Sequence, residues 1–85
     1  MTLNIDQLKK KIIYRSNYRG TKEMDILLSN FVKKYIDQLN QEELKELDKF
    51  LDFEDDVILD FYQNGIVKQS IDKNKISKIF KSYQI

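Results

Sequence analysis

Apolar residues recur at helical spacing along almost the whole chain, and this pattern constrains the fold more than any other feature. A helix completes a turn about every 3.6 residues, so apolar residues three or four positions apart share one face. No stretch alternates apolar and polar residues for long, as a half-buried strand would. The sequence therefore predicts an all-α protein, a bundle of about five short helices. The apolar stripes are Ile5, Leu8 and Ile12; Met24, Leu27, Leu28, Phe31, Tyr35 and Leu39; Leu44, Leu47 and Leu51 with Phe50; Val57 or Ile58 with Phe61 and Tyr62; and Ile76, Ile79, Phe80 and Tyr83.

Helix-capping residues mark the boundaries between these stripes. Asn40 followed by Glu43 matches a capping box, in which each side chain bonds the other residue's backbone N–H. Acidic residues 54–56 suit the positive end of a helix. Gly65 is expected to end the fourth helix in the left-handed conformation. Asp72 is expected to cap the last helix.

Length and charge restrict the class of protein. We expect residues 1–85 to form one small domain with a single core. The 15 basic and 14 acidic residues leave a net charge of +1. Phosphate binding requires a concentrated excess of Lys and Arg, so nucleic acid is not expected as the main partner. No membrane span is expected, and the first residues lack the apolar core of a secretory signal.

The chain contains neither His nor Cys, which excludes several kinds of chemistry. A zinc site with the usual ligands, a cysteine nucleophile and a histidine base are all unavailable. Asp52 and residues 54–56 lack the glycine and the spacing of a calcium loop. We therefore expect no catalytic residues, no bound metal, no cofactor of its own and no enzymatic activity.

The stretch NYRGTKEMD, residues 17–25, is open to two interpretations. Arg19 and Glu23 are four residues apart, so on one continuous helix they would share an edge with Ile26, away from the core stripe. That edge could be a contact surface for a partner. Alternatively, Arg19 and Glu23 form only an exposed ion pair of little energetic value, and Gly20 is a turn between helices. Spacing alone does not decide between them.

The segment YRSNYRGTKEMDILLSNFVKKYI resembles the signature of the succinate dehydrogenase flavinylation factors. The RGxxE motif of that family is met by Arg19, Gly20 and Glu23, after an aromatic residue, Arg and Ser at positions 14–16. An acidic helix and an aromatic near a glycine follow in EELKELDKFLDFEDDVILDFYQNG, where Asp56 replaces the proline of the family's DPDL-type turn. The resemblance covers about residues 10–65, and residues 66–85 match only as a variable C-terminal helix.

The resemblance implies an assembly factor. Members of the family bind the flavoprotein subunit of succinate dehydrogenase, and in bacteria often that of fumarate reductase, and promote covalent attachment of FAD to it. The FAD then belongs to the client protein. We expect a monomer when the factor is free, located in the bacterial cytoplasm, or in the mitochondrial matrix for a mature eukaryotic form.

The resemblance also implies which residues bind the partner. Arg19 would anchor to client carboxylate or carbonyl groups, Gly20 would allow close backbone approach, and Glu23 would accept hydrogen bonds from the client. Arg15 and Asp25 would orient that face. Apolar contact would come from Tyr14, Tyr18 and Ile26, whereas Phe61 is expected in the core.

A second functional class stays open. A non-catalytic helical adaptor or a toxin-neutralising protein would have the same composition, and its binding partner would distinguish it from a flavinylation factor. The lysines of the last helix are expected to form a solvated face rather than a nucleic-acid site. They are Lys73, Lys75, Lys78 and Lys81.

Overall fold

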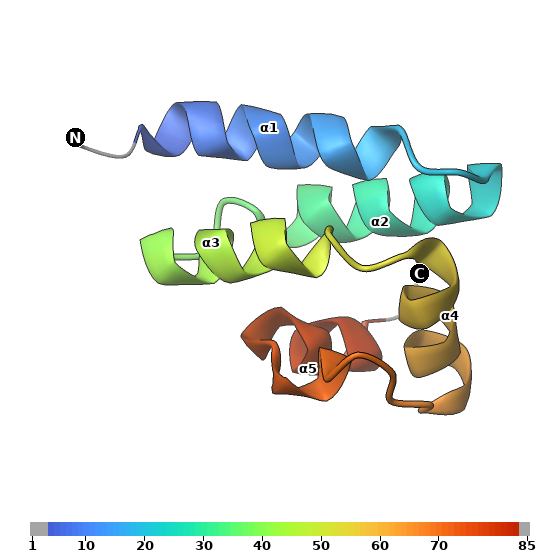
Figure 1. Cartoon of the computed structure of the whole chain (residues 1–85). Helices are drawn as coiled ribbons and strands as arrows, with labels where there is room; N and C mark the ends of the chain where they lie inside the picture. The colour runs from blue at the N-terminus through green and yellow to red at the C-terminus, as the bar shows by residue number, and fades with distance from the viewer. Residues whose placement is uncertain (1–3, 84–85) are drawn as a thin grey trace.

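The computed structural model describes residues 4–83 as a sequence of five α-helices and one 3-10 turn (Figure 1). Each apolar stripe of the sequence has its centre on one of the helices, so the all-α prediction is confirmed, although Leu39, Leu51 and Tyr83 lie beyond the ends of α2, α3 and α5. In chain order the elements are α1 (Ile5–Asn17), α2 (Lys22–Tyr35), α3 (Gln41–Phe50), α4 (Asp55–Asn64), η1 (Ile71–Lys73) and α5 (Lys75–Ser82).

The helices pack in two connected groups. α1 and α2 run antiparallel and pack against each other, and α1 also packs on α3 (Figure 1). α5 lies on the opposite side of α3 and packs against both α3 and α4. Within residues 4–83, no helix has both the length and the apolar character needed to cross a bilayer.

Side chains cap the helices where the sequence indicates. Asn40 and Glu43 form the predicted capping box: Glu43 N donates to Asn40 Oδ1 at 2.8 Å, and Asn40 N donates to Glu43 Oε1 at 3.0 Å. Thr21 caps α2 by accepting from Met24 N at 3.2 Å. Gly65 follows α4 in the left-handed conformation with φ 67°, also as predicted. These bonds satisfy backbone groups that a helix end leaves free.

The predicted cap of the last helix is wrong by two residues. Asp72 lies inside η1, and Asn74 caps α5 by accepting from Ile76 N at 2.8 Å. The buried Ile71 starts a 3-10 turn that occupies residues 71–73 and delays the helix. Asn74 also donates from Nδ2 to the carbonyl of Glu46 at 3.0 Å, which ties the start of α5 to α3.

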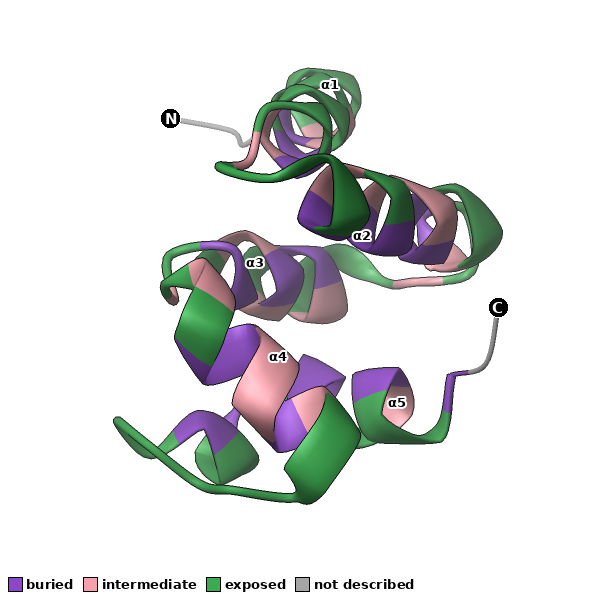
Figure 2. Cartoon of the chain, turned by 90° about the vertical axis from the view of Figure 1, so that its right-hand side faces the viewer, coloured by how far each residue is buried: buried purple, intermediate pink, exposed green. Residues whose placement is uncertain are grey.

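The core consists of apolar side chains on the inward faces of all five helices (Figure 2). Phe31 is fully buried, and its ring lies 5.0 Å from the ring of Phe80 and 5.3 Å from that of Tyr83. Phe61 is only 7% exposed, which confirms that it belongs to the core. Edge-to-face aromatic pairs of this kind add to the free energy gained from burial.

A charged cluster joins α1 to α3. Arg15 donates to the Asp48 carboxylate at 2.7 Å and to the Asp48 carbonyl at 2.9 Å, and Lys11 donates to the same carboxylate at 3.0 Å. Burial raises the pKa of the Asp48 carboxyl, but hydrogen bonds from Lys11 and Arg15 and their positive charges outweigh that effect. The net result is an Asp48 pKa below its ordinary value.

Asp48 should therefore contribute to the acid sensitivity of folding. A lowered carboxyl pKa stabilises the fold above the unfolded-state pKa of about 4, and this stability is lost as the pH falls through the folded-state pKa. We expect Asp48→Asn to be less stable than the wild type at pH 7 and to lose less stability between about pH 5 and pH 2. Urea denaturation across that range measures both effects. Parallel pH profiles for the two proteins would contradict the prediction.

Candidate partner-binding site

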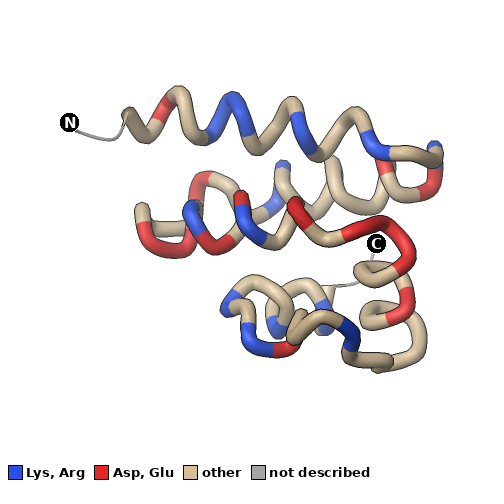
Figure 3. Tube along the Cα trace, in the orientation of Figure 1, with Lys and Arg blue, Asp and Glu red and all other residues tan. Residues whose placement is uncertain are grey.

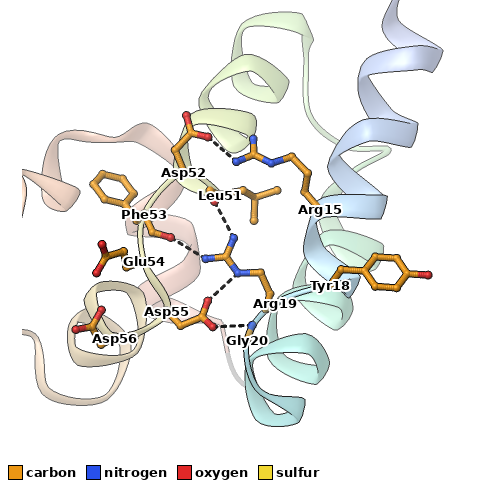
Figure 4. A pocket seen from close by; sticks show the side chains of 10 residues that line it. All are labelled: Arg15, Tyr18, Arg19, Gly20, Leu51, Asp52, Phe53, Glu54, Asp55 and Asp56. Atoms are coloured by element: carbon orange, nitrogen blue, oxygen red, sulfur yellow. Dashed lines mark hydrogen bonds and ion pairs between the residues drawn. The ribbon is translucent and has the colours of Figure 1, made fainter.

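Arg19 lies in the turn between α1 and α2 and points inward toward the segment between α3 and α4 (Figure 4). Its Nε donates to Asp55 Oδ1 at 2.8 Å, Nη1 to the Leu51 carbonyl at 2.7 Å, and Nη2 to the Phe53 carbonyl at 2.7 Å. Only 11% of the side chain is exposed. These residues together with Gly20 are called the Arg19 cluster below.

The structure does not place Arg19 and Glu23 on one helix edge, and that expectation is wrong. α2 begins at Lys22, after the extended Thr21 cap, so Arg19 precedes the helix. No ion pair joins Arg19 to Glu23 within the described chain. Three of the Arg19 N–H groups already donate to Asp55 and to two backbone carbonyls. In the folded chain Arg19 therefore holds other segments of the same chain together. Direct binding of a client by Arg19 stays a prediction.

Gly20 is required by a close internal contact. Its backbone N donates to Asp55 Oδ2 at 3.0 Å, and a Cβ on Gly20 would lie 3.1 Å from the same oxygen. Asp55 is also held by Arg19, so its carboxylate cannot withdraw without weakening both hydrogen bonds. The expected close approach between Gly20 and a client backbone stays a prediction.

We expect Gly20→Ala to lower the free energy of unfolding by about 1 kcal/mol, roughly the net value of one hydrogen bond. Chemical denaturation measures this loss. The control is the same substitution in an Asp55→Ala background, where the carboxylate is absent and the penalty should largely disappear. An equal penalty in both backgrounds would show that Asp55 is not the cause.

Asp25 and Arg15 form hydrogen bonds next to the Arg19 cluster. The Asp25 carboxylate accepts a hydrogen bond from the backbone N of Arg19, which fixes the end of the turn onto α2. Arg15 donates to Asp52 and Asp48 beside the cluster. Asp25 thus holds the turn and Arg15 holds the end of α3, and the role of both in orienting a face for the client stays a prediction.

The remaining predicted residues lie in two other places. Tyr14 lies on α1 and is 65% exposed, and the centre of its ring is 4.6 Å from the centre of the Tyr18 ring. The Tyr18 side chain points away from the Arg19 cluster (Figure 4). Glu23 and Ile26 line a separate groove between α2 and α4. The predicted set is thus divided into an internal cluster, an aromatic pair and a groove wall.

Some residues on α4 that complete the Arg19 cluster and the groove were not predicted from the sequence. Asp55 is the acceptor for both Arg19 and Gly20, whereas the sequence indicated only a charge at a helix N-terminus. Leu59 and Gln63 form the α4 wall of the groove. The spacing of Leu59 and Gln63 places them on one helical face, but no local signal shows that α2 lies opposite.

The acidic residues do not form a metal centre within residues 4–83. No group of three or more potential ligands converges there. Asp52 and Asp55 instead accept from the two arginines, and Glu54 and Asp56 point away from them (Figure 4).

Comparison with known protein families shows which family the chain belongs to. The model of the family described as flavinator of succinate dehydrogenase matches residues 10–84. The chain belongs to this family. The resemblance of the RGxxE region is therefore confirmed, and the flavinator match extends beyond residue 65 through α5.

Relatives in the flavinator family support the assignment. The chain is 43% identical over 82 residues to a protein of Debaryomyces hansenii, covering 95% of this chain and 58% of that protein. It is 42% identical over 77 residues to one of Scheffersomyces stipitis, covering 89% and 52%. Both are named mitochondrial succinate dehydrogenase assembly factor 2. The chain thus spans about half the length of these relatives.

Proposed function

We propose that this chain promotes covalent FAD attachment to the flavoprotein subunit of succinate dehydrogenase. The single observation that carries the proposal is the flavinator family match over residues 10–84. The two relatives are named succinate dehydrogenase assembly factors, which supports a role in the assembly of that enzyme. No finding favours the adaptor or toxin-neutralising alternative. Action on fumarate reductase stays a prediction.

The proposed mechanism is conformational. The resemblance implies that FAD becomes attached to a histidine of the client, and this chain, which contains no His, would not supply that acceptor. By binding the client, this chain would favour an arrangement in which the reacting groups are held together, and such alignment can contribute several kcal/mol. The Arg19 cluster fixes the α1–α2 turn to the start of α4, so the client would meet a rigid surface. No step requires a catalytic residue or a cofactor of the chain itself.

The names of the relatives also concern the location of the protein in the cell. Those in Debaryomyces hansenii and Scheffersomyces stipitis are named as mitochondrial proteins. This supports a mitochondrial matrix location for the present chain rather than the bacterial cytoplasm. A monomeric free state stays part of the proposal.

Co-expression tests the proposal directly. The flavoprotein subunit is produced with and without this chain, and in-gel flavin fluorescence after denaturation reports covalent FAD. We expect a strong fluorescent band only in the presence of the chain, and co-purification of the two proteins. Equal fluorescence without the chain, and no association, would overturn the proposal.

Glu23 offers a sharper test than Gly20, because a Gly20 substitution also disturbs Asp55. The Glu23 side chain is exposed and forms no hydrogen bond or ion pair with another residue among residues 4–83. We expect Glu23→Ala to slow flavin attachment about tenfold, the effect of losing one well-placed interfacial contact. Helical content, measured by circular dichroism, should not change.

The matched control for Glu23 is Asp72→Ala, which removes an exposed carboxylate in η1. Flavin attachment should proceed at the wild-type rate with this variant. If Glu23→Ala also shows the wild-type rate, the assignment of Glu23 to the client interface is wrong.

A further inference from the structure

An open groove separates the first half of α2 from the middle of α4. It is lined by Lys22, Glu23, Ile26, Leu27, Leu59 and Gln63 and has a volume of about 390 Å³. Ile26 is 46% exposed, although its neighbour Leu27 is buried in the core. Ile26 and Leu59 thus give the groove an apolar floor that the described chain does not cover. The whole groove, with its six lining residues, is called the α2–α4 groove below.

Negative charge surrounds the end of the groove near Gly20. Acidic residues lie in the first turns of both α2 and α4, and the hydrogen bond from Gly20 N to Asp55 joins these two helix starts, so this corner is acidic (Figure 3). Arg19 neutralises only one of these acids, Asp55. Glu23, at the rim, has no cationic partner within residues 4–83. The acids of the two first turns are Glu23, Asp25, Asp55 and Asp56, with Glu54 at the α4 N-cap, and the nearby cations are Arg19 and Lys22, of which Lys22 also lines the groove.

The two walls of the groove are held at a fixed separation. The start of α4 is bonded to the turn before α2 through Asp55, which accepts from Gly20 N and from Arg19 Nε. On α4, Leu59 and Gln63 are four residues apart and share the face that lines the groove. The groove therefore has an apolar floor with Glu23 at its rim, both positioned before any partner arrives.

We propose that the α2–α4 groove receives an apolar side chain of the client flavoprotein, and that an adjacent Arg or Lys of the same client segment pairs with Glu23. The inference rests on the proposed function and specifies the surface and the chemistry of the client segment. Apolar burial supplies affinity at the floor. Glu23 and the carboxylates at the starts of α2 and α4 favour a basic partner over an acidic one.

The test compares two exposed isoleucines of similar accessibility. Ile26 lies in the groove, whereas Ile13, 40% exposed, lies on α1 outside it. A glutamate at position 26 would place an unpaired charge against the apolar client side chain. We expect Ile26→Glu to raise the Kd for the purified flavoprotein subunit by roughly tenfold or more. Ile13→Glu should leave the Kd unchanged.

Charge reversal tests the basic residue of the client. Glu23→Lys should weaken binding more than Asp72→Lys does, and the difference should shrink as salt is added. A benzophenone amino acid at position 26 should crosslink to a client peptide that contains an Arg or Lys within a few residues of the crosslinked site. A crosslink to a peptide without a basic residue would overturn the proposed client chemistry.

The outcomes separate this inference from the proposed function. If the wild type neither binds nor flavinylates the subunit, the proposed function fails and this inference fails with it. If the wild type does both and Ile26→Glu binds equally well, only the groove assignment is overturned. If Ile26→Glu instead converts a dimer of the free chain to a monomer in analytical ultracentrifugation, the groove joins two copies and the client proposal is wrong.

Discussion

Arg19→Ala is expected to lower the free energy of unfolding by about 2–3 kcal/mol. The substitution leaves the Asp55 carboxylate and the carbonyls of Leu51 and Phe53 without their guanidinium donor. Removing one partner of a buried ion pair typically costs about 3–5 kcal/mol, and the partial exposure of Asp55 reduces that figure. Urea denaturation followed by circular dichroism measures the loss.

Two comparisons show whether the geometry of the guanidinium matters. Arg19→Lys keeps the positive charge but cannot bond three acceptors in one plane, so it should recover only part of the lost stability. Lys75→Ala breaks the exposed pair with Glu42 and should barely shift the denaturation midpoint. An Arg19→Ala midpoint as close to the wild type as that of Lys75→Ala would refute an internal role for Arg19.

Phe31→Ala is expected to have the largest effect, a loss of about 3–5 kcal/mol, as for other buried Phe residues. Phe31 is fully buried and packs against the rings of Tyr35, Phe80 and Tyr83. A domain of this length has about 4–13 kcal/mol of stability in total, so the substitution removes a large share of it. Thermal and chemical denaturation report the change.

Two further variants, Phe31→Leu and Tyr14→Ala, provide stabilities with which that of Phe31→Ala can be compared. Leucine fills much of the space, so Phe31→Leu should be clearly more stable than Phe31→Ala. Tyr14 is largely exposed, and its truncation should change stability little. A Phe31→Ala variant as stable as Tyr14→Ala would show that the aromatic group around Phe31 is not the centre of the core.

The helices and most of their ends follow from local sequence. Asn40 and Glu43 are three residues apart, and their capping box depends on that spacing alone. Gly65 is similarly determined, because a left-handed residue favours glycine. The shift of the last cap from Asp72 to Asn74 has a tertiary cause, since Ile71 is buried and Asn74 reaches Glu46.

The candidate site was only partly predictable from sequence. The RGxxE motif directed attention to residues 19–23, but no local pattern indicates that Arg19 reaches Asp55, 36 residues away. The same holds for the α2–α4 groove, whose walls come from two separate helices. Helical periodicity identifies which residues face away from a helix's own core stripe, but it does not show which other helix lies beside them.

The Arg19 cluster has a consequence for motion in the folded chain. Because one guanidinium and one carboxylate connect the α1–α2 turn to the α3–α4 segment, neither loop can open alone without breaking the bonds of both. The two loops should therefore behave as one cooperative unit in native-state hydrogen exchange. The amide of Gly20, although it lies in a surface turn, should exchange with solvent deuterium as slowly as amides inside a helix.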